Sequence, residues 1–283
     1  MKKINCPAVD DDNELDKLAG NKKLGSYPEL QNNSAVIKQQ YQEYLNKEGD
    51  AWAMASCNLP AELQTSLKAH YGQPPKDRLQ FLDELRRNLS PDICPMCGGL
   101  GTGTIDHYLP KNNYAEFAIF SKNLIPACSC NSLRKTTVKG DLEPERVIHP
   151  YYDKFLEDRL YQAVFEGDYK TPSISVKIEN INHPQIEILK FHLEEVVLKN
   201  HIISWLEKRW GDLSRRPHKI LGFLLPKGEI DGLELKTCIC SYVEVKDDEY
   251  ETPNNWWSIF YYGLKTDQIR LDRLAYEINI LRN

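Results

Sequence analysis

The stretch CPMCGGLGTGTIDHYLPKNNYAEFAIFSKNLIPACSCNSLRK, residues 94–135, decides the fold that the sequence predicts. Two cysteine pairs bracket it: Cys94 and Cys97 are separated by two residues, and Cys128 and Cys130 by one. Two short thiolate half-sites are typical of a tetrahedral zinc site, which can hold together a hairpin too small to form its own core. We therefore expect structural Zn²⁺ here. The alternatives are a three-sulfur site, because C-x-C is tighter than the usual C-x-x-C, and four reduced cysteines in a small core.

Bulk properties place the chain among cytoplasmic globular proteins. Its 283 residues contain no run of about eighteen apolar residues, so we expect no membrane span. The N-terminus lacks the apolar segment of a secretory signal. Eight cysteines in a cytoplasmic chain should be reduced or metal-bound rather than paired in disulfides. A net charge of −5 argues against strong nucleic-acid binding by charge alone, although it allows a local basic groove.

Three regions of different character follow from the turn-forming residues and the apolar periodicity. The first is a helical arm or cap, with a loosely ordered start and expected helices at 33–49, 60–72 and 76–90. The middle is a compact, metal-rich module, and the last is mixed and mainly helical. Together they predict an α+β fold around a central hairpin module, with regions at residues 1–90, 91–150 and 151–283.

The C-terminal region contains strand and helix signals in succession. Residues 173–180 alternate apolar and polar side chains, as a strand does, and Pro184 opens a long helical stretch. Residues 233–245 also predict a strand, with Cys238 and Cys240 packed on one face. One or two helices are expected to close the chain.

Asp106 and His107 lie inside the cysteine frame and supply groups suited to phosphodiester hydrolysis. A histidine with its ordinary pKa of about 6.5 can take a proton from water at neutral pH. A carboxylate and the amide oxygen of Asn131 can hold a hydrated Mg²⁺ or Mn²⁺ ion, which neutralises charge on a phosphate. Neighbouring strand residues point to opposite faces, so the pair can cooperate only where the strand ends, and Pro110 supplies that end. The alternative is that the pair belongs to an ordinary turn.

The motif around this pair runs through Asp106-His107-x-x-Pro110, Asn123-Leu124-x-Pro126-x-Cys128 and Cys130-Asn131. Its order and spacing resemble those of the HNH nucleases, also called ββα-metal nucleases, over about a fifth of the chain. The resemblance implies a central ββα-metal module in which His107 is the general base. It further implies that Asp106 and Asn131 bind the catalytic Mg²⁺ or Mn²⁺, and that Asn123 stabilises the loop that presents the histidine.

Basic residues near the module are the expected nucleic-acid contacts. The family tends to place a lysine three residues after the final asparagine, where this chain has Arg134 followed by Lys135, and either cation can touch a phosphate. Lys111 is a further candidate. His149 is either a weak phosphate or metal contact or the cap of a turn before a proline. Residues 199–219 either follow a phosphate backbone with their lysines, arginines and tryptophans, or form an ordinary amphipathic helix.

The resemblance predicts a metal-dependent HNH endonuclease that hydrolyses DNA, with RNA as an open alternative. One rival is a non-catalytic zinc module that binds nucleic acid or protein, and another is a stand-alone HNH restriction endonuclease. The large flanking regions and the acidic balance favour a subunit of a larger assembly. The architecture is similar to nuclease effectors of bacterial antiphage defence, such as those of Septu and retron-associated systems, which implies an ATPase partner.

Overall fold

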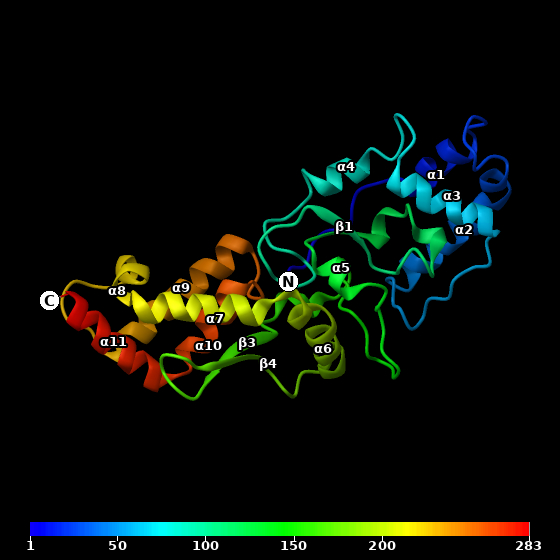
Figure 1. Cartoon of the computed structure of the whole chain (residues 1–283). Helices are drawn as coiled ribbons and strands as arrows, with labels where there is room; N and C mark the ends of the chain where they lie inside the picture. The colour runs from blue at the N-terminus through cyan, green and yellow to red at the C-terminus, as the bar shows by residue number, and fades with distance from the viewer. Residues whose placement is uncertain (283) are drawn as a thin grey trace.

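Two small antiparallel sheets, each of two strands, lie among helices in the computed structural model, which describes residues 1–282. The α+β class predicted from the sequence is therefore confirmed. The helices and strands are α1 (Asp11–Ala19), α2 (Glu29–Asn46), α3 (Ala61–Gly72), α4 (Phe81–Arg86), β1 (Thr104–His107), β2 (Leu124–Ala127), α5 (Cys130–Arg134), β3 (Tyr161–Glu166), β4 (Ser173–Ile178), α6 (Ile186–His192), α7 (Ile202–Arg215), α8 (Pro217–Ile220), α9 (Gly232–Tyr250), α10 (Trp256–Lys265) and α11 (Gln268–Arg282). Figure 1 shows an elongated molecule, with α1, α2 and α3 at one end and α8 and α11 at the other.

The first sheet is a hairpin built from the cysteine-framed stretch. β1 pairs antiparallel with β2, so that Asp106 lies opposite Ile125 and His107 lies opposite Leu124. β1 ends at His107, shortly before Pro110, as the sequence predicts. All residues of β2 are buried, and α5 begins a few residues after it, so a strand pair and a short helix follow one another in the chain.

The N-terminal helices pack directly onto this hairpin. Tyr44 of α2 is fully buried, and its hydroxyl donates a hydrogen bond to Asn123 Oδ1 over 3.2 Å. At the start of α1, the Asp11 carboxylate accepts hydrogen bonds of 2.8 Å from the backbone N–H and from the hydroxyl of Ser121. The same carboxylate pairs with Lys122. These buried contacts tie the arm to the segment between the two strands.

The second sheet organises the C-terminal region. β3 and β4 pair antiparallel, from Tyr161 opposite Ile178 to Glu166 opposite Ser173. α10 packs across β3 (Figure 1). The approach is close enough to require a glycine, because a Cβ at Gly263 would lie 2.0 Å from the carbonyl oxygen of Ala163. The helix and the strand are therefore held at backbone contact distance.

The prediction of a strand at residues 233–245 is wrong, because this segment lies within α9. A capping box at Asp231 starts the helix. Its buried residues then recur every fourth position, at Leu235, Ile239 and Val243, which is helical periodicity. The local alternation of apolar and polar residues suggested a strand, whereas the capping signal and the longer period correctly indicate a helix. The two cysteines of this segment are half-buried and lie on the helix.

The prediction that the chain starts with a loosely ordered segment is also wrong, because α1 lies there. Asp10 caps α1 by accepting a hydrogen bond from the backbone N–H of Asn13 over 3.0 Å. α2 begins at Glu29, four residues before the expected start at residue 33. In the C-terminal region, the expected long helical stretch is interrupted at His201, whose φ of +60° is left-handed. α6 and α7 lie on either side of this break.

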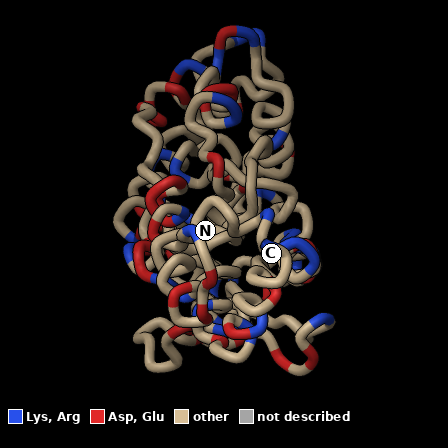
Figure 2. Tube along the Cα trace, turned by 90° about the vertical axis from the view of Figure 1, so that its left-hand side faces the viewer, with Lys and Arg blue, Asp and Glu red and all other residues tan. Residues whose placement is uncertain are grey.

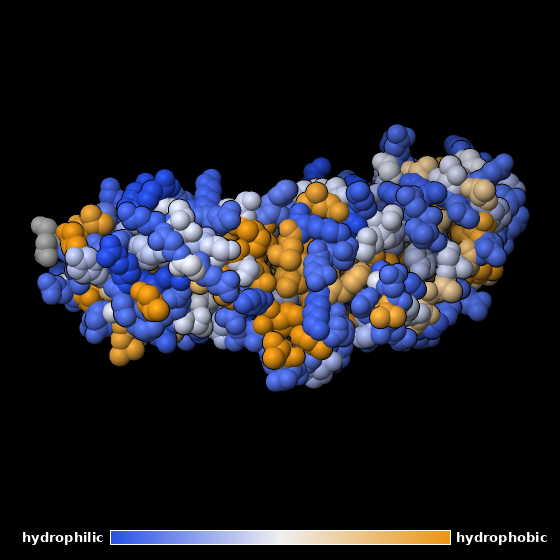
Figure 3. All heavy atoms as spheres, turned by 60° about the horizontal axis from the view of Figure 1, so that its bottom comes forward, coloured by the Kyte–Doolittle hydropathy of each residue, from blue (hydrophilic) through white to orange (hydrophobic). Residues whose placement is uncertain are grey.

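Charged and apolar residues are both spread over the surface. Figure 2 shows basic and acidic residues interspersed along the trace, and Figure 3 shows apolar side chains in separate patches, most densely near the middle of the long axis. Among the helices of residues 1–282, none is both long enough and apolar enough for a membrane-spanning segment.

Candidate metal centre and the Asp106–His107 site

The four cysteines of the central stretch converge on one point. Their sulfur atoms all lie within 4.8 Å of one another, with Cys94 and Cys130 at 3.6 Å and Cys97 and Cys128 at 3.5 Å. A tetrahedral zinc ion with Zn–S bonds of about 2.3 Å holds its sulfurs about 3.8 Å apart, so the cluster fits this geometry closely. Hydrogen bonding to Cys130 lowers the pKa of the Cys128 thiol, whereas hydrogen bonding to Cys128 raises the pKa of the Cys97 and Cys130 thiols. These cysteines could hold a metal ion such as zinc. Both residues of the C-x-C half-site, Cys128 and Cys130, belong to the cluster.

The cluster is also anchored by residues far away in the sequence. The side-chain amide of Asn200 donates hydrogen bonds to the sulfurs of Cys97 (3.0 Å) and Cys128 (3.4 Å). The backbone N–H of Gly99 donates to the Cys97 sulfur over 3.4 Å, and the indole of Trp256 donates to the Cys97 carbonyl oxygen over 2.8 Å. N–H groups aimed at sulfur stabilise thiolate charge. Neither Asn200 nor Trp256 is recognisable as a partner of the cysteines from the sequence, because no local pattern marks either residue.

His107 is buried at the end of β1, with 7% of its surface exposed. Its Nε2 lies 3.0 Å from the carbonyl oxygen of Ala118, which can only accept, so Nε2 carries the proton. Burial lowers the pKa of His107 to about 3, and the ring is therefore neutral at pH 7. Nδ1 is left unprotonated, and within residues 1–282 no group donates a hydrogen bond to it. A neutral imidazole with a free nitrogen is the chemical form that a general base needs.

Asp106 contacts Arg134 of α5. Arg134 Nη2 lies 2.9 Å and 2.8 Å from the two carboxylate oxygens, and its Nε lies 3.2 Å from one of them. Arg134 also donates to the His107 carbonyl oxygen over 3.0 Å. Burial raises the pKa of the Asp106 carboxyl, and the Arg134 guanidinium opposes that rise. The structure therefore makes Arg134 an internal partner of Asp106, with 1% of its surface exposed, rather than a surface contact for phosphate.

Asn131 lies on α5, as Arg134 does, but its side chain contacts Thr104 of β1 and not Asp106. Its side-chain amide donates a hydrogen bond to the Thr104 hydroxyl over 2.9 Å, and its oxygen accepts one from Ser132 over 2.9 Å. The amide oxygen and the Asp106 carboxylate thus each have protein partners of their own. In this arrangement Mg²⁺ or Mn²⁺ fits poorly between them, because Arg134 already neutralises the only carboxylate of the pair. An ion at Asp106 requires Arg134 to move away.

Asn123 bonds to the backbone of the segment that follows His107. It is fully buried, and its Oδ1 accepts a hydrogen bond from the backbone N–H of Leu109 over 2.7 Å. Its Nδ2 donates to the carbonyl oxygens of Leu109 (3.0 Å) and Phe117 (3.3 Å). These bonds join two points of the segment that follows His107. One side chain thus bonds both backbone groups of Leu109 and gives the Phe117 carbonyl oxygen a second donor beside the Phe120 N–H.

The remaining predicted contacts fall into different environments. Lys135 is exposed at the end of α5, and Lys111 is half-buried in the loop after β1. His149 is 2% exposed: its Nε2 lies 2.9 Å from the Tyr44 hydroxyl, and its Nδ1 accepts a hydrogen bond from the backbone N–H of Tyr151 over 3.3 Å. His149 therefore has no free ring nitrogen to offer a phosphate or a metal ion.

Of the two alternatives for the basic stretch at residues 199–219, the structure matches the amphipathic helix, which is α7. Trp210 is buried, and its indole donates to a backbone carbonyl. Arg209 and Arg215 of α7, and Arg216 just after its end, lie around Asp212 at 3.0–3.7 Å. The arginines of this stretch are therefore partly neutralised by an acid within it.

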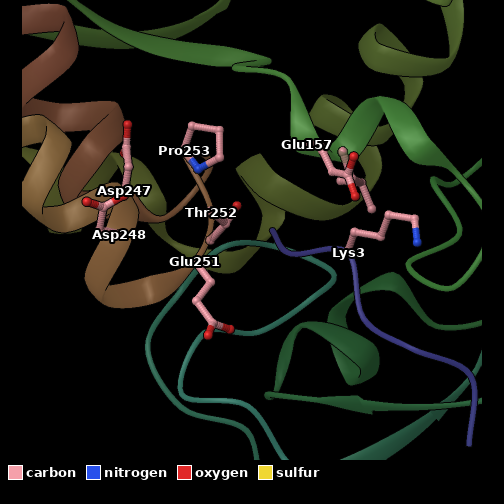
Figure 4. Close-up of a pocket in the computed structure, with 8 residues that line it drawn as sticks. Lys3, Glu157, Asp247, Asp248, Glu251, Thr252 and Pro253 are labelled. Carbon is pink, nitrogen blue, oxygen red and sulfur yellow. The ribbon is translucent and has the colours of Figure 1, made fainter.

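A separate hollow of about 460 Å³, whose lining does not include His107, is shown in Figure 4. Four acids line it, together with one lysine, and it contains none of the residues predicted for catalysis. Its negative charge would repel a phosphate backbone. The lining acids are Glu157, Asp247, Asp248 and Glu251.

Comparison with known proteins finds a partial likeness to a phage protein. A stretch of 83 residues is 41% identical to Protein ea31 of Escherichia phage lambda. The stretch is 28% of this chain and 28% of the phage protein, so the chain spans less than a third of that relative's length. No protein-family model matches the chain, and no solved structure matches it.

Proposed function

We propose that the protein is an endonuclease of the HNH type that hydrolyses phosphodiester bonds in DNA, with His107 as the general base. The observation that carries the proposal is the state of the His107 ring: neutral, with Nε2 bound to the Ala118 carbonyl and Nδ1 free. A phosphate beside the ring would add negative charge and raise its pKa from about 3 toward the working pH. His107 could then take a proton from the attacking water.

The other module residues have supporting roles in this proposal. Asn123 holds the segment after the histidine in place, and the cysteine cluster, with zinc bound, holds the hairpin together. We propose Mg²⁺ or Mn²⁺ as the catalytic cofactor; Asp106 and Asn131 would hold it only in a state in which Arg134 has left Asp106, because the ion fits poorly in the arrangement described above. When bound, the ion supplies positive charge at the phosphate. Its binding depends on the release of Asp106 by Arg134.

A wider role is part of the same proposal. We place the enzyme in the cytoplasm of a bacterial host, as the nuclease subunit of an antiphage assembly of the Septu or retron-associated kind, with an ATPase partner. The support is the large share of the chain outside the hairpin. The rival role, a stand-alone restriction endonuclease, would give discrete fragments from the purified protein without any partner.

One observation favours a second candidate function, a non-catalytic zinc module that binds nucleic acid or protein. Arg134 satisfies both oxygens of Asp106 and is itself buried. In that case the ion pair serves to hold α5 against β1, and Asp106 never meets a metal ion.

The deciding experiment is a nicking assay on supercoiled plasmid with purified, zinc-loaded protein. Mg²⁺ or Mn²⁺ is added or omitted, rather than chelated, so that the cysteine cluster keeps its zinc. We expect nicking by the wild type only with the added ion, and loss of nicking in His107→Ala. The matched control is His201→Asn, because His201 is exposed and asparagine tolerates its left-handed backbone.

Each outcome decides between the candidates. Equal nicking by wild type and His107→Ala would remove His107 as the base. If the wild type binds plasmid but does not nick it, with or without a co-purified partner, the binding-module function is correct. Zinc content measured in the same samples separates a loss of catalysis from a loss of the fold.

A further inference from the structure

Two cations from separate segments lie over the ring of Tyr71, and a third, Lys68, is on the same helix as Tyr71. Lys111 Nζ, in the loop after β1, lies 4.3 Å from the ring centroid, and the guanidinium carbon of Arg86, at the end of α4, lies 5.9 Å from it. Lys68 lies three residues before Tyr71 on α3, and residues at this spacing share a helix face. The ring itself contacts His107, with the ring centroids 4.2 Å apart. The arm therefore brings positive charge to the histidine that the hairpin presents.

Two of these cations lack an acidic partner. Arg86 pairs with Asp83, one turn earlier on the same helix, at 3.3 Å. Within residues 1–282 neither Lys68 nor Lys111 forms an ion pair. Lys111 is half-buried, and its pKa is lowered, first by burial and then by the charge of Lys68. Two ammonium groups that repel each other, with neither paired to a carboxylate and that of Lys111 over an aromatic ring, form a site that would attract an anion.

We propose that Lys68 and Lys111 clamp a backbone phosphate of the nucleic acid and so place a phosphodiester beside His107. This inference rests on the proposed function and adds the N-terminal arm to the substrate-binding surface. Charge complementarity supports a nucleic-acid occupant, because two cations without an acidic partner attract a phosphate. Lys111 lies over the ring of Tyr71, and that ring contacts His107. Tyr71 is a positioning residue in this arrangement: its ring packs edge-on against His107, and its hydroxyl donates to the Ile105 carbonyl oxygen over 3.2 Å.

The test measures binding without cleavage. A fluorescently labelled DNA duplex of about 20 base pairs is titrated with protein in the absence of Mg²⁺ and Mn²⁺, at several salt concentrations between about 50 and 200 mM. The variants are Lys68→Ala/Lys111→Ala and the charge-keeping Lys68→Arg/Lys111→Arg. The matched control, Lys22→Ala/Lys227→Ala, removes the same charge from two exposed lysines elsewhere. Melting temperatures check that each variant folds.

The expected result follows from counterion release. Losing this one phosphate contact makes the negative slope of log K against log salt shallower by about 0.9, which corresponds to a loss of about eightfold in affinity for the pair at about 0.1 M salt. The alanine pair should show both effects, while the arginine pair and the control should bind like the wild type. Unchanged affinity and slope in the alanine pair, or no duplex binding by the wild type, would overturn the clamp.

The two proposals fail in different ways. Lysine-dependent binding by a protein that never nicks plasmid would support the clamp and reject the nuclease. Nicking by the alanine pair with an unchanged KM would keep the nuclease and reject the clamp.

Discussion

Replacing Asn123 by alanine tests whether one side chain holds the segment that presents His107. The substitution removes the partner of the Leu109 N–H and one partner each of the Leu109 and Phe117 carbonyl oxygens. A buried backbone group left without a partner costs about 1–3 kcal/mol, and carbonyls with a second lone pair lose less. Because Asn123 is fully buried, we expect Asn123→Ala to lower the free energy of unfolding by about 2–4 kcal/mol.

The assay compares melting temperatures at fixed free zinc, with Asn254→Ala as a matched control. Asn254 is equally buried, and it also bonds three backbone groups, those of Leu160, Leu156 and Asp158. At about 2 °C per kcal/mol for a chain of this size, both variants should melt about 4–8 °C lower. Only Asn123→Ala should also change the NMR signals of the His107 ring. A melting temperature within about 1 °C of the wild type would refute the reasoning that these bonds hold the segment.

Three further predictions concern metal, charge and pH. Metal analysis should find one zinc per chain in the wild type and none in Cys130→Ser. With free zinc at about 1,000 times the Kd of the wild type for zinc, the variant should lose about 4.1 kcal/mol of stabilisation, which melting measures. Arg134→Ala leaves the buried Asp106 carboxylate unpaired and should lower the free energy of unfolding by about 3–5 kcal/mol in urea titrations, and a loss below 1 kcal/mol would contradict the ion pair. Burial lowers the pKa of His192 to about 3, so the folded protein holds it neutral while the unfolded chain protonates it below about pH 6.5. The stability advantage of the wild type over His192→Gln should therefore shrink by about 2 kcal/mol between pH 7 and pH 5, whereas a constant difference would show that His192 titrates alike in both states.

Short-range features of the hairpin are predictable from the sequence alone. The spacing of the cysteines indicates a metal cluster, because ligands a few residues apart can converge without help from the rest of the fold. The end of β1 before Pro110 follows from the missing N–H of proline. The α+β class also follows from local periodicity. The same local reasoning fails for residues 233–245, where a short alternation outweighed the capping signal at Asp231.

The environment of each site residue was decided only by the tertiary structure. Asp106 pairs with Arg134, and His107 meets Tyr71, because α5 and α3 pack against the same hairpin from different parts of the chain. Asn200 reaches the cysteine sulfurs from the C-terminal region in the same way. The physical reason is that desolvation and partner choice depend on which distant segments pack together. The sequence by itself determined which chemical groups the hairpin carries, and the fold decided which of them are neutral, paired or free.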